Sequence, residues 1–561
     1  MKRLDIHRVL ALIAFSILVA VLYRLVLNAL SSGCTINGHI YNVCYYVDYA
    51  TGSNTNDGLS KTTPFKTPIG APGHDIAAPQ GTAQILKGGV TWPMNAIGCW
   101  TWTGGQGTRS SSNPDYIGAG DQIWFTGVSW SRPILNGNGA SVSPAGCPQV
   151  VNTVVAPDIY IFTSNSYLTI DNIEFTGALW GHTTVTCGLS CDGYVYLHTN
   201  NVTSVHVQNS YFHGASMGAN TDCAIAGCNP GFAMYGGTQS PVDVVAENDV
   251  IDGSDGPEVL ADPSCVGKCE SELYGILGHW SYLKHDLARY VSEGFDGGFQ
   301  YINGNTVEYV RASNNTSSGA HANGIQLDEA YLGCLIWNNL VRHTNPVNRV
   351  NLRGVQTLGI TNKFGTVCYG WNGVIYDTTN NNQWNWAYAS ADHSARGTQI
   401  MFNWTIAGGP EGAPNTANSG ANCVTYQWCT VDNIHYITNA ATSIANCTAS
   451  THCTDGGHNL FKTLTVANRH GYSSTRTFAY STTAGGASIG GGGSIVAWCS
   501  AIAAILAEAG ADCLADTSYG VGYNSANHTV IVPGRTPNAR NTSAPNHGAY
   551  EFLNAAGRQL F

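Results

Sequence analysis

The chain has 561 residues, with 35 Asp and Glu against 24 Lys and Arg and a formal net charge of -11 at pH 7. This acidic balance argues against nucleic acid as a partner. Charged residues make up only 11% of the chain while Gly numbers 66, which favours a surface rich in turns. Because one repeat occupies the middle of the chain, we expect a single domain with terminal caps.

The N-terminus is basic and then apolar, which is typical of a secretory signal peptide or an uncleaved signal anchor. An uncharged apolar run extends from Val9 to Tyr23, and a second apolar piece follows Arg24 and ends at Leu30. We assign residues 1–31 to this segment and expect the mature chain to be secreted or in the cell envelope. Residues 9–30 would be its only contact with a membrane.

The 18 cysteines favour export, because most fall into near neighbours of the kind that pin loops with disulfides. The expected short-range pairs are Cys34–Cys44, Cys187–Cys191, Cys223–Cys228, Cys265–Cys269, Cys423–Cys429, Cys447–Cys453 and Cys499–Cys513. The four remaining residues leave Cys99 with Cys147 and Cys334 with Cys368. A metal site is disfavoured because His partners at close spacing are absent.

A short pattern recurs through the middle of the chain: an apolar alternation, an Asn, and a second apolar pair. The Asn positions are Asn172, Asn209, Asn248, Asn305, Asn338, Asn372, Asn403 and Asn433. Subtracting successive numbers gives spacings of 37, 39, 57, 33, 34, 31 and 30. A drifting period of this size indicates stacked repeats.

The positions four and two residues before each Asn are mostly apolar, which is the period of a strand. We therefore predict an all-β right-handed parallel β-helix, a solenoid of about nine to eleven coils. A β-sandwich with scattered Asn turns is the alternative. The Asn amides are expected to bond to one another as a ladder from coil to coil. Cys334 and Cys368 each lie four residues before an Asn, so a disulfide is expected to join adjacent coils.

Both ends of the chain resemble a known family. YYVDYATGSNTNDGLSKTTPFKT (Tyr45–Thr67), QILKGGVTW (Gln84–Trp92) and the closing SAPNHGAYEF (Ser543–Phe552) resemble secreted bacterial right-handed parallel β-helix proteins of the pectate-lyase-like superfamily. The resemblance implies this fold, whereas the same opening heads lyases, hydrolases and proteins of no known reaction.

We divide the chain into the signal segment, an N-terminal cap with the first coils at 32–150, the coils at 151–440 and a C-terminal region at 441–561. The long interval between Asn248 and Asn305 predicts an insertion that is either a short helix or one irregular coil. The Ala-rich run from Ile495 to Gly510 predicts a short C-terminal cap helix. The last residues are expected to form a closing strand.

Candidate site residues come from counting back from the Asn column. Asp296, Glu329 and Lys363 all lie nine residues before an Asn and should stack, with Asp328 adjacent. Such carboxylates are ligands that Ca²⁺ prefers, so Asp296, Asp328 and Glu329 form the predicted metal site. The alternative is a purely structural role, in which these charges form a solvent-exposed ladder of salt bridges.

The family resemblance implies a division of labour in which acidic residues hold calcium and an Arg or Lys acts as base. Lys363 is the predicted base, and Arg349 or Arg353 is the alternative assignment. An acidic polysaccharide is the expected partner, bound by His321 and by the alternating aromatics Trp384, Trp386 and Tyr388.

The resulting hypothesis is a monomeric, calcium-dependent polysaccharide lyase acting on uronates by β-elimination. Two other classes stay open. One is a glycoside hydrolase, which needs two carboxylates about 5 to 10 Å apart. The other is a non-catalytic glycan-binding or structural surface protein.

Overall fold

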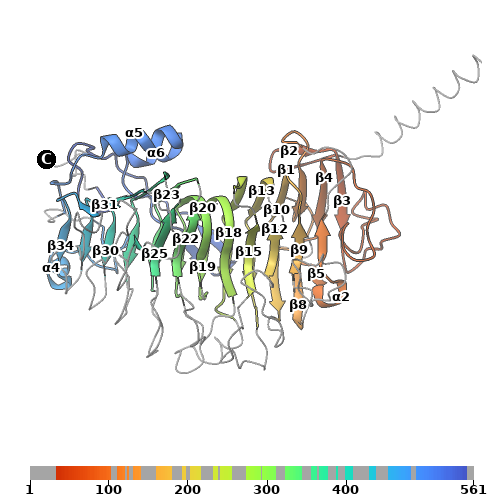
Figure 1. Ribbon diagram of the computed structural model, residues 1–561. Coiled ribbons are helices and arrows are strands. Elements are labelled where there is room, and N and C mark those ends of the chain that lie inside the picture. Colours follow the sequence, from red (N-terminus) through yellow and green to blue (C-terminus); the bar gives the residue numbers. More distant parts are fainter. Residues whose placement is uncertain are drawn as a thin grey trace, which may run out of the picture.

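The computed structural model describes residues 33–102, 110–120, 123–125, 131–140, 159–179, 193–197, 202–216, 231–237, 240–255, 273–291, 293–310, 323–330, 332–343, 356–362, 365–376, 387–388, 398–407, 429–437, 453–481 and 488–551. Two large parallel sheets, of 20 and 12 strands, run the length of the body (Figure 1). The predicted parallel β-helix is thus confirmed as an architecture, and its right-handedness stays a prediction.

Each coil contributes up to three strands, the first two to the larger sheet and the third to the smaller one. The first strands are β6 (Trp100–Trp102), β9 (Ile159–Thr163), β12 (Gly193–Leu197), β15 (Gly231–Gly237), β22 (Asn323–Ala330), β25 (Gln356–Asn362) and β28 (Ala387–Tyr388). The second strands are β3 (Val43–Val47), β4 (Thr82–Leu86), β7 (Asp115–Gly118), β10 (Leu168–Asp171), β13 (Thr203–Gln208), β16 (Val242–Glu247), β23 (Cys334–Trp337), β26 (Val367–Trp371), β29 (Thr398–Phe402), β31 (Cys429–Asp432) and β33 (Cys453–Asp455). In β18 (Leu273–Lys284) and β20 (Phe295–Asn303) first and second strand are continuous.

The third strands form the smaller sheet, here called sheet E, whose twelve members exceed the nine to eleven predicted coils. They are β5 (Thr91–Pro93), β8 (Ile134–Ala140), β11 (Glu174–Ala178), β14 (Tyr211–His213), β17 (Val250–Asp252), β19 (Leu287–Arg289), β21 (Thr306–Glu308), β24 (Leu340–Arg342), β27 (Val374–Tyr376), β30 (Thr405–Ala407), β32 (His435–Ile437) and β34 (Leu460–Lys462). The remaining elements are the hairpins β1 (Cys34–Ile36) with β2 (His39–Tyr41) and β35 (Gly522–Asn524) with β36 (Thr529–Ile531), and the helices α2 (Met94–Ile97), α4 (Leu464–Arg469), α5 (Val496–Ile505) and α6 (Ala507–Cys513).

The apolar columns read from the sequence are the core of the solenoid. Leu168 pairs in register with Val205, which pairs with Val244, and all three are buried. On sheet E the buried rings of Phe175 and Phe212 stack with centroids 4.7 Å apart. Burial of such columns stabilises the fold in proportion to the apolar area removed from water.

The recurring Asn residues mark the turn between second and third strands rather than a ladder of amides. Seven of the eight have left-handed backbone conformations, with φ from 56° to 61°. Asn is favoured there because it adopts this conformation more readily than other residues that carry a side chain. The exception is Asn305, because Gly304 takes the turn position in its coil at φ 68°.

A ladder does exist, one residue after the turn. Its members are Ser210, Asp249, Asp286, Asn305 and Asn339, and the side chain of each accepts a hydrogen bond from the backbone of the coil before it. The predicted ladder of Asn amides is therefore corrected: the ladder lies one residue after the turn, and its members are Ser, Asp and Asn.

The long interval between Asn248 and Asn305 includes an additional coil, and none of the described residues in it is helical. His285 is its turn residue, at φ 59°, 37 residues after Asn248 and 19 before Gly304. This coil contains β18 and β19 in place of the predicted irregular segment. A coil was one of the two predicted alternatives, and its turn was not recognised in the sequence because His replaces Asn there.

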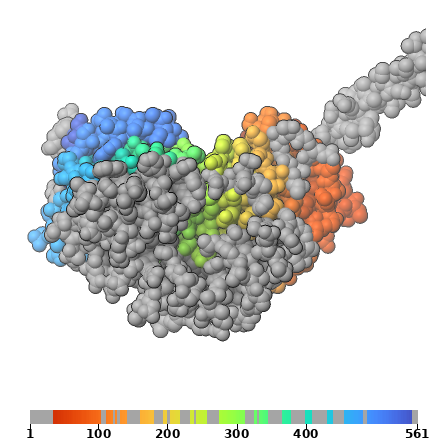
Figure 2. Space-filling model, viewed as in Figure 1, coloured from red at the N-terminus to blue at the C-terminus, as the bar shows by residue number. Residues whose placement is uncertain are grey.

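The predicted C-terminal helix is two helices, α5 and α6, interrupted at Leu506, whose backbone is extended. They do not cap the end of the solenoid. They lie over the outer face of the second strands, where Trp337 and Trp371 stack 5.2 Å apart and Trp337 Nε1 donates to Asp512 Oδ2 at 2.7 Å. Figure 2 shows a hollow in the surface between these helices (blue) and the N-terminal coils (orange).

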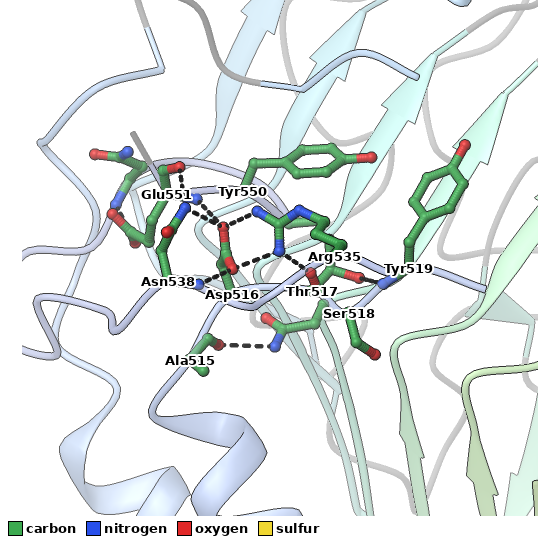
Figure 3. A network of polar contacts seen from close by, with 12 residues as sticks. Ala515, Asp516, Thr517, Ser518, Tyr519, Arg535, Asn538, Tyr550 and Glu551 are labelled. Atoms are coloured by element: carbon green, nitrogen blue, oxygen red, sulfur yellow. Dashed lines mark hydrogen bonds and ion pairs between the residues drawn. The ribbon is translucent and has the colours of Figure 1, made fainter. Parts of the chain in front are cut away.

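The chain after α4 runs back over the outer face of sheet E and is fastened by a buried polar network (Figure 3). Asp516 accepts hydrogen bonds from Arg535 Nη1 at 2.7 Å and from the backbone N–H groups of Asn538 and Glu551 at 2.6 and 2.9 Å. Arg540 Nη1 donates to Glu551 Oε1 at 2.8 Å. The closing sequence that carries the family resemblance is thus part of this fastening, and residues 543–551 form no strand.

Three predicted disulfides are confirmed: Cys34–Cys44, Cys334–Cys368 and Cys499–Cys513. Cys334 and Cys368 are direct partners on adjacent coils with Cα atoms 4.3 Å apart. Cys99 is also disulfide-bonded. The other predicted pairs involve residues outside the described ranges or side chains that are not described. The signal segment at 1–31 also lies outside, and no helix within the described ranges is long and apolar enough to span a membrane.

Two turn residues with the same conformation give a stability prediction. Asn372 is bonded to Ala515 O at 2.9 Å and to Arg540 Nη2 at 3.0 Å, whereas the buried amide of Asn403 has no hydrogen-bond partner among the described residues. Asn372→Gly should therefore lower the free energy of unfolding by about 2–4 kcal/mol. Asn403→Gly should change it by less than about 1 kcal/mol, since Gly adopts this turn freely. Denaturant unfolding checks both, and equal losses would show that the conformation alone matters.

Candidate functional site

The outer face of the first strands carries Asp296. In β20 Phe295 is fully buried and Asp296 is partly exposed, which places the Asp296 side chain on the outer face. On the next coil Gln326 is partly exposed between buried Ile325 and Leu327. Asp296 and Gln326 are direct partners in the register. A carboxylate and an amide thus lie side by side, with their backbones about 4.8 Å apart.

Asp328 and Glu329 follow in the same strand and form a β-bulge. β22 and β25 are in register up to Leu327, and the register shifts before it resumes at Ala330. A bulge locally bends the strand and re-aims its side chains. Asp328 is two residues after Gln326, so the register brings it to within two positions of Asp296 on the neighbouring strand.

The predicted stacking of Asp296, Glu329 and Lys363 is wrong, because Asp296 is opposite Gln326 instead. The reason is the continuity of β20, which passes from first to second strand without a connection. The next coil has a bulge and a connection between β22 and β23. Counting back from the turn therefore reaches different positions on the two coils.

One predicted sugar-binding residue lies in the same column as Asp296. Gln326 pairs with Gly359, and Gly359 pairs with Tyr388. The backbone column thus runs across four coils, from Asp296 to Tyr388. The predicted residues that lie outside the described ranges are His321, Arg349, Arg353, Lys363, Trp384 and Trp386. Of these, Lys363 directly follows the last residue of β25.

In the N-terminal direction the same column becomes aromatic, which the sequence reasoning missed. Asp296 pairs with Leu277, and the column continues through Tyr235, Tyr196 and Phe162. The rings of Tyr196 and Tyr235 stack 5.0 Å apart with 12° between their planes. The only sequence signal is an aromatic residue in each first strand, and the varying lengths between those strands conceal it.

The donor chemistry of this corner fits a calcium ion. Among the side chains that the structure describes, no group of three His, Cys, Asp or Glu could hold a metal. The side chains of Asp328 and Glu329 are not among them. The two adjacent strands β20 and β22 contain Asp296, Gln326, Asp328 and Glu329. All are hard oxygen donors of the kind that Ca²⁺ prefers.

Sheet E carries a second set of charges on its outer face, in strict alternation. Asp252, Arg289, Glu308 and Arg342 are successive partners in the register. Arg289 Nε lies 3.3 Å from Glu308 Oε1, and Arg342 Nη2 lies 2.6 Å from Glu308 Oε2. Both carboxylates are almost fully buried. A ladder of salt bridges therefore exists on this face, and its mutual pairing gives it a structural role.

His213 stands beside the N-terminal end of that ladder, between two carboxylates. Its Nδ1 is 2.5 Å from Asp255 Oδ2 and its Nε2 is 3.1 Å from Glu174 Oε1. Burial alone would lower the pKa of His213, but the hydrogen bonds to Asp255 and Glu174 outweigh it and raise the pKa to about 9. The imidazolium is thus a structural cation at neutral pH.

Comparison with known proteins gives a distant likeness of fold. No family model matches the chain, and no curated protein is similar to it in sequence. A crystal structure of the pectate lyase Pel9A is similar at a TM-score of 0.38 and 13% identity, covering 82% of this chain and 93% of that one. A rhamnogalacturonan lyase is similar at 0.32 and 13%, covering 75% and 86%.

The GH136 lacto-N-biosidase from Eubacterium ramulus is similar at 0.38 and 12%, covering 76% of this chain and 68% of that one. At these values the similarity carries no information on activity. The strand register defines the chain as a parallel β-helix protein, in agreement with the resemblance of its two ends.

The His213 cluster generates a prediction on pH dependence. Because its pKa is raised above the usual 6.5, the stability that it contributes is present below pH 6.5 and is lost as the pH rises through about 9. His213→Gln should lower the free energy of unfolding by about 1–3 kcal/mol in mildly acidic buffer, since one pKa unit corresponds to ~1.4 kcal/mol and Asp255 is partly solvated. Denaturant unfolding across this range should show the deficit shrink. A deficit that is independent of pH would mean that His213 acts by packing alone.

Proposed function

We propose that the chain is an extracytoplasmic, carbohydrate-active β-helix protein that acts on an acidic polysaccharide as a calcium-dependent lyase. The observation that carries the proposal is the register at the corner of β20 and β22. It sets Asp296 beside Gln326, with the Asp328–Glu329 bulge two positions on. Three disulfides support the location, because such bonds persist in oxidising compartments.

A polymer suits this surface because the column that contains Asp296 repeats from coil to coil. On one side of Asp296 lies the partly exposed ring of Tyr235, which stacks on the buried ring of Tyr196, and Tyr388 lies in the column on the other side. Aromatic side chains offer apolar area with a polar edge, which suits sugar rings. Trp384, Trp386 and His321 are proposed to extend this contact from the neighbouring loops. We propose that the protein acts as a monomer.

The cation would be held by Asp296, Asp328 and Glu329, with the Gln326 amide oxygen as a further donor. When bound there, Ca²⁺ neutralises a substrate carboxylate and so acidifies the neighbouring C5 proton. The chain itself must position the uronate against the outer face of β20 and β22.

Lys363 is the proposed base, with Arg349 or Arg353 in its place if Lys363 is dispensable. It directly follows β25, which pairs with the strand that contains Asp328 and Glu329. The base takes the C5 proton, the electron pair forms the C4–C5 double bond, and the C4–O bond breaks. The departing glycosyl oxygen takes up a proton. The β-elimination is therefore balanced without an oxidant, a reductant or water.

The test is a screen of pectate, alginate and other uronates with and without Ca²⁺, followed by the ultraviolet absorbance of the new double bond. Lys363→Ala should lower kcat about 10²–10⁴-fold and spare sugar binding, since it removes only proton transfer. Glu329→Gln should abolish the calcium-dependent activity or binding, because it removes a proposed ligand of the cation. Matched controls are Lys462→Ala on β34 and Asp243→Asn at an exposed position, which should behave like the parent.

The outcomes separate the classes of function. New reducing ends without the absorbance would identify a hydrolase, and binding without products a lectin-like protein. Either result overturns the lyase. Parent-like turnover in both Lys363→Ala and Glu329→Gln would place the site elsewhere on the solenoid.

A further inference from the structure

The interior ladder after the turn contains two acids where amides would be expected. Asn305 and Asn339 show what an amide does there. Asn339 Oδ1 accepts from the Asn305 backbone N–H at 3.0 Å, and its Nδ2 donates to Ile302 O at 2.9 Å. In the same way Asn305 Nδ2 donates to Leu283 O at 3.0 Å. Each amide therefore links two coils with one accepted and one donated bond.

The acceptor half of this arrangement is complete at Asp249 and Asp286. Asp249 Oδ1 accepts from the Ser210 backbone N–H at 2.7 Å, and Asp286 Oδ1 accepts from the Asp249 backbone N–H at 2.9 Å. The second oxygen of each, Oδ2, is buried and has no hydrogen-bond partner among the described residues. Both residues are 0% exposed. An isolated buried anion is costly, so these oxygens need an explanation.

The register indicates which groups face the unpartnered oxygens. Each carbonyl that accepts from a ladder amide belongs to the residue three positions before the ladder residue of the preceding coil. By this rule the carbonyl that faces Asp249 is that of Val207, and the carbonyl that faces Asp286 is that of Ala246. Val207 and Ala246 are direct partners in the register. A carbonyl oxygen can only accept a hydrogen bond. It would repel a carboxylate oxygen and attract a protonated one.

The surrounding charges also favour the neutral acids. Burial raises the pKa of Asp249 and of Asp286 well above the usual value, and the negative charge of Asp249 raises the pKa of Asp286 further. Glu247 acts in the same direction on both, although it is itself paired with Lys284 at 3.2 Å. Asp171 adds to the effect on the pKa of Asp249, whereas the hydrogen bond from the Ser210 backbone N–H and the charge of Arg132 oppose it.

We propose that Asp249 and Asp286 are protonated in the folded chain at neutral pH and replace asparagine in the ladder. Each donates its Oδ2 proton to a backbone carbonyl oxygen, Asp249 to Val207 and Asp286 to Ala246. The protons come from solvent on folding, so no other reactant is involved. The central coils of the solenoid thereby contain a pH-sensitive link, one coil before the strand that carries Asp296.

The sign of the pH effect follows from proton linkage. In the unfolded chain both carboxyls ionise near pH ~3.9, whereas the folded chain keeps its protons to higher pH. Folding then takes up two protons, and the stabilisation is complete below the unfolded pKa. It is lost as the pH rises towards the folded pKa. Over that interval the folding equilibrium constant should fall about 100-fold per pH unit through these two residues.

The test compares the parent with the double variant Asp249→Asn/Asp286→Asn, which supplies the same donor and acceptor without a titratable proton. Denaturant unfolding is measured from about pH 5 to about pH 9. The folding equilibrium constant of the parent should fall more steeply than that of the double variant, by about 100-fold per pH unit. His213 is unchanged in both chains, so its contribution cancels. The converse variant, Asn305→Asp, should make the dependence steeper than in the parent.

Infrared difference spectra provide a readout that does not depend on unfolding. The parent at neutral pH should show the C=O stretch of protonated carboxyl groups, and the single variants Asp249→Asn and Asp286→Asn should each remove part of it. Parallel pH profiles of parent and double variant, or no protonated carboxyl band in the parent, would overturn the proposal. Failure of the double variant to fold would also overturn it, because an amide should substitute for a neutral acid.

Discussion

The structure depends on one constraint, which is that equivalent residues of successive coils stack in register about 4.8 Å apart. Stacking in register places equivalent residues of adjacent coils side by side. Apolar positions therefore form continuous buried columns, and the turns of adjacent coils lie next to one another. The constraint is severe for polar groups. Charges can be tolerated only when their signs alternate, as on sheet E, or when they are neutralised, as we propose for Asp249 and Asp286.

Much of the fold was predictable because each repeat is recognisable from residues that lie within a few positions of one another in the sequence. The strand period fixed the core columns, and the cysteine offsets gave the bond between Cys334 and Cys368. The pattern failed where a different residue satisfied the same backbone requirement. His285 and Gly304 adopt the left-handed turn without being Asn, so the turn of one coil was not recognised and the neighbouring coil was misaligned. Helices α5 and α6 were expected as an end cap, but they pack on Trp337 and Trp371, which face outward from the second strands and are buried beneath the helices, and a helix pattern does not reveal this.

The candidate site was harder to predict because it depends on the first strands, whose distance from the turn varies between coils. Counting back placed Asp296 over Glu329, whereas the continuous β20 places it over Gln326. Asp328 still follows Gln326 by two residues in β22, and the count did not include the register shift between Leu327 and Ala330. The division between the two outer faces is chemical: sheet E pairs its charges with one another, while β20 and β22 contain Asp296 and the other oxygen donors of the proposed site.

The most direct test of this account is a crystal structure of the chain with Ca²⁺ and a uronate oligosaccharide. The account predicts a cation bound by Asp296 together with Asp328 or Glu329, and a sugar carboxylate against the outer face of β20 and β22. An oligosaccharide bound instead on sheet E, or a cation bound away from Asp296, would contradict it.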